Sequence, residues 1–235
     1  MHLFIGEFEQ KDQKVFINNK RIVHQLKNVL RASLGYTFGI QPPVYVGDSP
    51  DNEIYILQLD SIDKNQLEAS ILETHKKSKQ INNNGFLIPI LNNFDKMELL
   101  VQKLTEIGTE NIYFWDAARS QIHNINNKKL DRFYKISLEA AEQSGQILLP
   151  NIGIVQDIKK FTKDKEIVFI DFQASKKSLS TKSKNLWGVV GPEGGFSQDE
   201  SSYFGSISKE KLSLGESVLR VETATIIGAW IIQNF

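Results

Sequence analysis

The 235-residue chain contains no cysteine. This absence excludes disulfide bonds, zinc sites with cysteine ligands and thiol catalysis. Histidines are few, and none of the four stands at a spacing typical of metal ligands on a helix, so we expect no metal site. The chain also lacks an apolar run near the roughly 20 residues that cross a bilayer, and its first residues do not resemble a signal peptide. We therefore expect a cytoplasmic protein that does not enter a membrane.

An excess of charge is also absent, because 28 lysines and arginines balance 28 aspartates and glutamates. The total charge therefore gives no sign of a nucleic-acid partner, whereas local clusters do. Each cluster is either a solvated face or a phosphate-binding patch. The basic clusters are Lys76, Lys77 and Lys79; Lys128, Lys129, Arg132 and Lys135; and Lys159, Lys160, Lys163, Lys165, Lys176, Lys177, Lys182 and Lys184.

Short β-rich runs separated by turn residues dominate the first 72 residues. Strands are expected at 3–8, 15–17, 44–46, 53–59 and 67–72, with one helical turn at 24–31. Several short strands at close spacing predict a small β-barrel for residues 1–72. The polar stretch 73–84 is predicted to be a linker.

Strands and helices alternate from residue 85 to residue 235. Apolar runs at 166–172 and 186–190 predict buried strands, and 112–115 predicts a further strand. The apolar run 86–91 contains Pro89 and predicts an irregular segment or an edge strand. The apolar periodicity at 96–107, 128–143 and 222–235 predicts helices. Gly108 is the expected C-cap of the first of these helices. The alternation predicts an α/β domain with a mostly parallel sheet covered on both faces.

Two glycine-bearing loops are the most informative segments. The first, Gly191-Pro192-Glu193-Gly194-Gly195, follows an apolar strand and leads to Ser197, an expected helix N-cap with Glu200 at the capping-box spacing. The second is centred on Gly215 and leads into the last helix. Glycine lets the backbone approach a ligand, because no side chain intervenes. The loops therefore predict a pocket made largely of backbone; they match neither a dinucleotide-binding loop nor a P-loop.

An ordered set of segments resembles one enzyme family over nearly the whole chain. The two loops together, with Leu219, Arg220, Glu222, Thr223 and Ala224 in the second, resemble the carboxy-terminal signature of the SPOUT methyltransferases and, more narrowly, of the RsmE family. Further segments agree with that family: residues 102–108, 118–120, 139–145 with Pro150, and His24 with Val29-Leu30-Arg31 and Gly35.

The resemblance implies more than the pattern. It implies an amino-terminal PUA-like β-barrel that binds RNA, and a carboxy-terminal α/β domain with a deep trefoil knot that holds S-adenosylmethionine and pairs with a second subunit as a homodimer. The implied reaction is methylation of N3 of a uridine in 16S rRNA of the small ribosomal subunit. By resemblance, the cofactor-binding residues are Gly191, Pro192, Glu193, Gly194, Gly195, Leu214, Gly215, Leu219, Thr223 and Ala224.

Arg220 and Glu222 are the candidate catalytic residues. Methyl transfer needs the lone pair of uracil N3, so the proton must leave while negative charge spreads onto O2 and O4. Arg220 is the candidate for stabilising that charge, and Glu222 either orients Arg220 or accepts the proton. The alternative is a structural role for these two residues, as an ion pair at the start of a helix. Arg31, Lys103 and Arg119 are the candidate contacts to RNA phosphates, and simple surface charge is their alternative.

One departure from the family bears on function. Gln146 stands where the family usually has arginine, which removes one expected phosphate or substrate contact. This departure favours one alternative, an RNA-binding module that has lost catalysis. A second alternative, independent of Gln146, is another SPOUT activity, such as ribose 2′-O-methylation of rRNA or tRNA.

Overall fold

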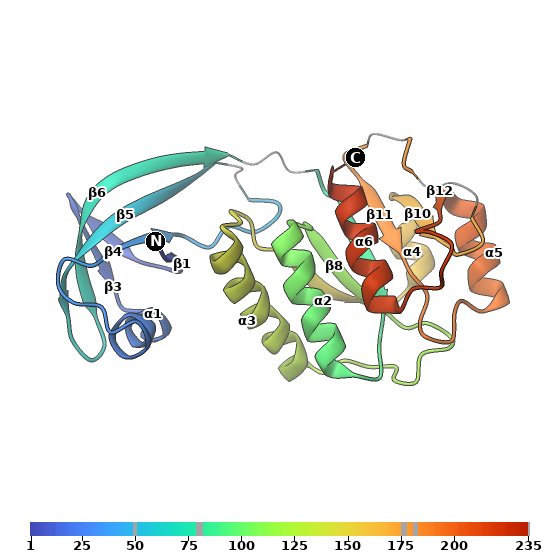
Figure 1. Ribbon diagram of the computed structural model, residues 1–235, viewed down its shortest axis with the longest axis horizontal. Coiled ribbons are helices and arrows are strands. Elements are labelled where there is room, and N and C mark those ends of the chain that lie inside the picture. Colours follow the sequence, from blue (N-terminus) through green and yellow to red (C-terminus); the bar gives the residue numbers. More distant parts are fainter. Residues whose placement is uncertain (49–50, 79–81, 175–177, 181–182, 235) are drawn as a thin grey trace. The chain divides into compact units, whose positions relative to one another are not determined.

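The computed structural model describes residues 1–48, 51–78, 82–174, 178–180 and 183–234 (Figure 1). The chain forms two compact units. The first comprises Met1–Gln80 with Ala141–Leu149, and the second comprises Ile81–Ala140 with Pro150–Phe235. Among the described residues, no helix combines the length and the apolar character that a membrane crossing needs.

A curled six-stranded sheet forms the first unit, where the sequence predicts a small barrel. Its order is β1-β4-β5-β6-β3-β2, with β1 and β4 parallel and the other pairs antiparallel. A short helix and a π-helical turn bury Ile22, Val23 and Leu26 against it. The elements are β1 (Leu3–Ile5), β2 (Glu9–Lys11), β3 (Lys14–Ile17), α1 (Lys20–His24), η1 (Gln25–Val29), β4 (Thr37–Gln41), β5 (Asp51–Ile62) and β6 (Leu67–Ser78).

The predicted linker at 73–84 is wrong over residues 73–78, which continue β6. These residues pair with the first half of β5, from Ile56↔Glu73 to Asp51↔Ser78. Their polar composition reflects an exposed strand, because every side chain from Glu73 to Ser78 is exposed. Residues 79–81 of the predicted linker lie outside the described residues.

Two further details of the first unit differ from the expectation. The run 44–46 contributes only an isolated bridge, Tyr45↔Leu149, instead of a strand. Conversely β4 is a strand although Gly39 suggests a turn. A Cβ at Gly39 would stand 3.0 Å from the Leu3 side chain, so glycine permits the close approach of β1.

The second unit contains a six-stranded sheet in the order β12-β10-β11-β7-β8-β9, and every pair is parallel. This confirms the predicted α/β class. The expectation of an irregular segment or an edge strand at 86–91 is wrong: β7 lies between β11 and β8, and Pro89 is its last residue. The strands are β7 (Gly85–Pro89), β8 (Asn111–Trp115), β9 (Asn151–Val155), β10 (Glu166–Ile170), β11 (Leu186–Val189) and β12 (Ser208–Leu212). The helices are α2 (Phe94–Ile107), α3 (Asn127–Ser144), α4 (Ile158–Thr162), α5 (Gln198–Ile207) and α6 (Val221–Asn234).

Helices cover both faces of this sheet, as the alternating pattern predicts. Phe86 and Ile88 belong to the core beneath α2, α3 and α6, whereas Leu87 belongs to the core beneath α4 and α5. Successive residues of a strand point to opposite faces. A strand buried on both sides therefore reads as a continuous apolar run, which is the signal in the sequence.

The order of the strands has one consequence for function. From β7 the chain adds β8 and β9 on one side, and β11 later pairs between β7 and β10, which both precede it in sequence. The direction of winding thus changes next to β7. In open parallel sheets, ligands bind at the carboxyl ends of the strands around such a switch point.

Local signals set the helix ends as predicted. Ser197 and Glu200 form a complete capping box at the start of α5. Gly108 ends α2 in the left-handed conformation, with φ of 88°. A left-handed C-cap strongly favours glycine because of the missing Cβ. The helices expected at 96–107, 128–143 and 222–235 are all present, with ends within two residues of the expectation.

Two helical glycines provide a matched test of this packing. A Cβ at Gly228 in α6 would lie 2.3 Å from Ile170 Cδ1, so Gly228→Ala is expected to cost about 1–3 kcal/mol of unfolding free energy through overpacking. At Gly205 in α5 a Cβ would meet only the flexible end of Lys211, so Gly205→Ala should be neutral or gain about 0.5–1 kcal/mol. Urea denaturation followed by tryptophan fluorescence reports on this unit, which contains all three tryptophans. Equal stability of the two variants would contradict the packing.

Candidate functional site

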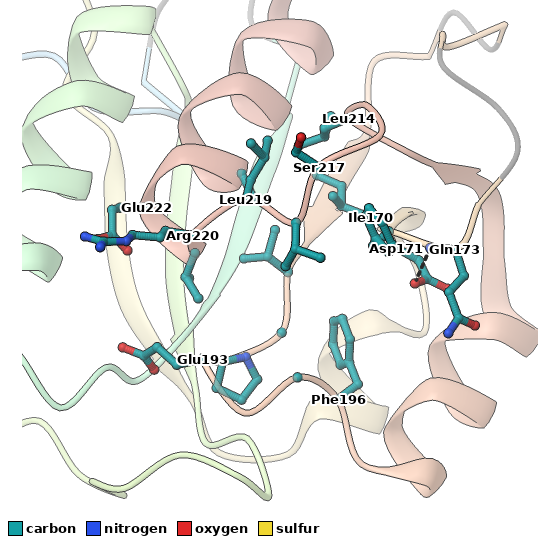
Figure 2. Close-up of a pocket in the computed structure, with 18 of the residues that line it drawn as sticks. Ile170, Asp171, Gln173, Glu193, Phe196, Leu214, Ser217, Leu219, Arg220 and Glu222 are labelled. Carbon is teal, nitrogen blue, oxygen red and sulfur yellow. Dashed lines mark hydrogen bonds between the residues drawn. The ribbon is translucent and has the colours of Figure 1, made fainter.

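A pocket of about 720 Å³ lies in the second unit, at the carboxyl ends of its central strands. Three segments line it, as Figure 2 shows: the end of β10 with residues 171–173, the loop 190–197 between β11 and α5, and the loop 214–220 with the first turn of α6. Lys96, from the first turn of α2, completes one side. The pocket therefore lies where the change of winding direction predicts a ligand site.

Most of the residues predicted for the site line this pocket. They are Gly191, Pro192, Glu193, Gly195, Leu214, Gly215, Leu219, Arg220, Glu222 and Ala224. Gly194 and Thr223 do not line it: Gly194 contacts Arg119 instead, and the Thr223 side chain is exposed on α6. The ligand-binding roles of all these residues stay predictions.

The first loop is held by an aromatic anchor. Phe196 packs edge-on against Phe169 and Phe204 and stacks near Trp115. A Cβ at Gly191 would stand 2.9 Å from the Phe196 ring, so the turn closes on the ring only with glycine there. A tight turn follows, in which the Gly195 N–H donates to Pro192 O at 2.8 Å.

Side-chain hydrogen bonds brace the same loop from outside the pocket. Arg119 Nη1 donates to Gly194 O at 2.8 Å, and the Ala118 N–H donates to Glu200 Oε1 at 2.6 Å. The Glu200 carboxylate also accepts from the Ser197 N–H at 2.7 Å. Arg119 therefore supports the loop, while its predicted contact with an RNA phosphate stays a prediction.

The second loop supplies an apolar wall. Gly215 has φ of 137°, a conformation that L side chains rarely adopt. The buried Ser213 hydroxyl accepts from Gly215 N at 3.4 Å and donates to Gly215 O at 3.0 Å, which holds the turn. Leu214, Leu219 and Ala224 then face the pocket beside Ile170. Apolar side chains beside glycine backbone suit a flat ligand that needs a few backbone hydrogen bonds.

Charged side chains gather at the opposite end of the pocket. In Figure 2 the side chains of Arg220, Glu222 and Glu193 lie together, well apart from Asp171 and Gln173. Lys96 Nζ lies 3.2 Å from Glu222 Oε1 and 3.8 Å from Glu193 Oε1. One lysine of α2 therefore joins a carboxylate of each glycine loop.

Glu222 stays ionised in this setting. Burial raises the pKa of its carboxyl group, but hydrogen bonds from its own backbone N–H and from Lys96, with the positive charges of Lys96 and Arg220, outweigh burial and hold the pKa below its ordinary value of 4.5. The side chain is 15% exposed. Its second oxygen, Oε2, is buried without a hydrogen-bond partner among the described residues. A carboxylate with a lowered pKa is a weak base and a good acceptor.

The remaining predicted residues lie away from the pocket. Lys103 pairs with Glu106 on the same helix at 2.9 Å, and this partner offsets its charge. Arg31 belongs to the first unit and is exposed, with φ of 49°. Their contacts with RNA stay predictions. The described residues contain no group of three or more histidines, aspartates or glutamates placed to hold a metal ion.

Sequence reasoning missed Lys96 and the loop after β10. Asp171 directly follows a buried strand, a position that is a usable signal in a parallel sheet. Lys96 carries no such signal, because nothing in the sequence separates it from the other lysines on helix surfaces. Its role depends on α6 lying beside α2, as Figure 1 shows.

Comparison with known proteins first gives the class. The model of a family described as the RNA methyltransferase domain matches residues 80–233, which is more than half of the chain. The chain therefore belongs to this class of RNA methyltransferases.

Individual relatives then give the particular family. "Ribosomal RNA small subunit methyltransferase E" of Mesomycoplasma hyopneumoniae is 30% identical over 182 residues, which cover 74% of this chain and 79% of that protein. The protein of the same name from Rickettsia conorii is 26% identical and covers 95% of this chain and 91% of its own. The chain belongs to the ribosomal RNA small subunit methyltransferase E family, which is the RsmE family that its motifs resemble.

Solved structures share the fold. The methyltransferase E of Neisseria gonorrhoeae, bound to S-adenosyl methionine, superposes with a TM-score of 0.80 at 24% identity, over 97% of this chain and 95% of its own. A putative methyltransferase of Legionella pneumophila, in complex with the same cofactor, gives a TM-score of 0.81 at 22% identity, over 99% of this chain and 96% of its own.

The ionisation of Glu222 makes a prediction about stability and pH. A carboxyl group whose pKa is lowered by folding stabilises the protein above its ordinary pKa, and that contribution is lost as the pH falls through the lowered value. The difference in thermal midpoint between the wild type and Glu222→Gln is therefore expected to be constant from about pH 8 to pH 5.5 and to shrink below the ordinary value of 4.5. A difference that already shrinks between pH 7 and pH 6 would mean a raised pKa.

Proposed function

We propose that this chain is an S-adenosylmethionine-dependent methyltransferase that acts on N3 of a uridine in 16S rRNA of the small ribosomal subunit. The observation that carries the proposal is the pocket between the two glycine loops, in a chain of the methyltransferase E family. Relatives with that name act on small-subunit rRNA, and a structural neighbour holds S-adenosyl methionine.

The residues of the pocket fit the cofactor. Its volume of about 720 Å³ lies in the usual range for a small-molecule site and leaves room for part of a substrate. Leu214, Leu219 and Ala224 supply an apolar slot for a flat adenine, and the loop at Gly191 supplies backbone without side chains. The cofactor, when bound, supplies an electrophilic methyl group on a sulfonium centre.

The proposed chemistry of this chain is positioning and charge stabilisation. Uracil N3 carries a proton at neutral pH, and negative charge spreads onto O2 and O4 as that proton passes to solvent water. Arg220 lines the pocket, its backbone carbonyl accepts from the Ala224 N–H at 2.9 Å, and its guanidinium makes no hydrogen bond or ion pair with the described part of the chain. We propose that its guanidinium donates to the developing charge, as preorganised donors do in other active sites.

Glu222 plays a supporting role in this proposal. Its lowered pKa makes it a weak base, which disfavours the alternative in which it takes the N3 proton. The ion pair of Glu222 is with Lys96, at 3.2 Å, so Glu222 holds the positive charge of Lys96 at the end of the pocket proposed for the base. This arrangement supports the helix-start ion pair, with Lys96 as the partner in place of Arg220.

We also propose a homodimer formed through the second unit. Three exposed apolar side chains are Ile227 and Trp230 of α6 and Val218 of the second loop, at 37%, 50% and 78% exposed, and Val218 also lines the pocket. A second copy of the chain would bury such a surface. The trefoil knot, the RNA-binding role of the first unit and the cytoplasmic location stay predictions.

Substitution of Arg220 tests its role in the chemistry. Arg220→Ala is expected to slow single-turnover methyl transfer by about 100-fold or more, because a donor to the transition state is lost. The dissociation constant for S-adenosylmethionine, measured by titration calorimetry, should change by less than about threefold. Arg220→Lys is the graded control. It keeps the charge without the paired donors, so its methyl-transfer rate should fall between those of Arg220→Ala and the wild type. A near-normal rate in Arg220→Ala would refute the assignment.

The substrate is tested in cells. Deleting the gene for this chain is expected to remove 3-methyluridine from 16S rRNA, because this chain is the proposed enzyme for that modification. Nucleosides are quantified by mass spectrometry. A plasmid copy of the wild-type gene should restore it, and an Arg220→Ala copy should not. Persistence of 3-methyluridine with loss of a 2′-O-methylated nucleoside would favour the second SPOUT activity. Unchanged nucleosides together with absent cofactor binding would favour an RNA-binding module.

A further inference from the structure

Lys96 is the cation that joins the two glycine loops of the pocket. It lies in the first turn of α2, and its backbone N–H donates to the side chain of the N-cap Asn93 at 3.4 Å. Its ammonium group contacts Glu222 Oε1 at 3.2 Å and Glu193 Oε1 at 3.8 Å. Its side chain is 30% exposed, so the contacts with these carboxylates are partly shielded from water.

We propose that Lys96 is a positioning residue: it pairs with Glu222, and thereby leaves the guanidinium of Arg220 free to face the reacting base. The proposal rests on the methyl-transfer function above. Lys96 itself needs no contact with the substrate, because it acts through the carboxylate.

The balance of charge in the pocket supports this role. Among the described residues that line the pocket, the cations are Lys96 and Arg220, and the acids are Asp171, Glu193 and Glu222. Glu222 stands two residues from Arg220, and the positive charge of Arg220 helps to lower the pKa of Glu222. Even so, the ion pairs of Glu222 and Glu193 in the described structure are with Lys96. Without Lys96, the only cation lining the described pocket would be Arg220, and it would be drawn to Glu222.

The contacts of the two carboxylate oxygens of Glu222 support the same role for Lys96. Oε1 contacts Lys96, whereas Oε2 is buried without a partner among the described residues. A guanidinium binds a carboxylate best through both of its oxygens at once, and Lys96 already occupies one of them. Arg220 is the neighbouring donor. Lys96 therefore competes for the carboxylate that would otherwise bind the catalytic cation.

The chemistry of lysine suits the task. A lysine ammonium is a compact point charge that two carboxylates share, whereas an arginine guanidinium binds one carboxylate with a planar pair of donors. A lysine between Glu193 and Glu222 therefore links both loops, and leaves the planar group of Arg220 for O2 or O4 of the base.

A double-mutant cycle in the full-length protein tests the proposal. Single-turnover methyl transfer is timed with small ribosomal subunits that lack the methyl group and with saturating S-adenosylmethionine. Lys96→Met is expected to slow transfer by about tenfold or more, as misplacement of catalytic groups does. In a Glu222→Gln background, the same substitution should change the rate by less than about twofold, because its target carboxylate is gone. Lys96→Arg keeps the positive charge but binds one carboxylate instead of two, so its rate should fall between those of Lys96→Met and the wild type.

The matched control is Lys209→Met, which breaks an exposed ion pair with Glu166 between β12 and β10. Its rate should equal that of the wild type. Cofactor affinity is measured for every variant by calorimetry, and Lys96→Met should stay within about threefold of the wild type. A large loss of affinity would show a merely structural role. Slowing by the same factor in both backgrounds would show that Lys96 acts on the substrate directly.

A readout without catalysis separates this inference from the proposed function. The carboxyl ¹³C resonance of Glu222, assigned by its absence in Glu222→Gln, gives the pKa directly. Lys96→Met should raise this pKa, and Lys96→Arg should keep it low, because Lys96 adds a hydrogen bond and a positive charge to the backbone hydrogen bond that lowers it. An unchanged pKa in Lys96→Met overturns the pairing even if the enzyme is active. A raised pKa in a protein that never methylates uracil would refute the function and leave the pairing intact.

Discussion

The pairing of β11 between β7 and β10 is the constraint on which the pocket depends. It places the carboxyl end of β11 beside that of β7, so the loop at 190–197 opens next to the start of α2. On its other side β10 pairs with β12, and the loops after these two strands close the remaining walls. Trp187 and Gly188 show how fully this strand is enclosed: the ring of Trp187 leaves no space for a Cβ at Gly85, and Phe86 and Ile232 leave none at Gly188. Because this strand is tightly packed, the position at which the following loop begins is fixed.

Each glycine loop is held in place by side chains of the second unit. Phe196 anchors the first loop within the aromatic core, and Arg119 and Glu200 hold it from the outer side. The buried Ser213 hydroxyl holds the second loop at Gly215. Lys96 connects the charged ends of both loops to α2. The pocket is thus largely preformed by the protein, with an apolar end for a cofactor and a charged end for a base. Preformed groups of this kind stabilise charge without reorganising during the reaction.

The sequence specified what local chemistry controls. The capping box of Ser197 and Glu200, the left-handed Gly108 and the apolar runs of β8, β10 and β11 all act over a few residues, and each is found as predicted. Gly39 and residues 73–78 mislead because their composition reflects a close crossing strand and an exposed face, which depend on the tertiary structure. The same holds for Lys96, whose meaning comes from Glu222, 126 positions away in the chain and adjacent in space. The position of β11 is likewise a property of strand pairing at long range, and no periodicity encodes it.

The most direct test of the account is a crystal structure of the full chain with S-adenosylhomocysteine. The account predicts the adenine between Leu214, Leu219 and Ala224, the sulfur directed toward Arg220, and Lys96 still paired with Glu222. The loop at Gly191 should approach the ligand through its backbone, as a glycine there allows. A ligand bound elsewhere, or Arg220 paired with Glu222 in the complex, would contradict the central claim that this pocket holds the methyl donor and leaves Arg220 free for the base.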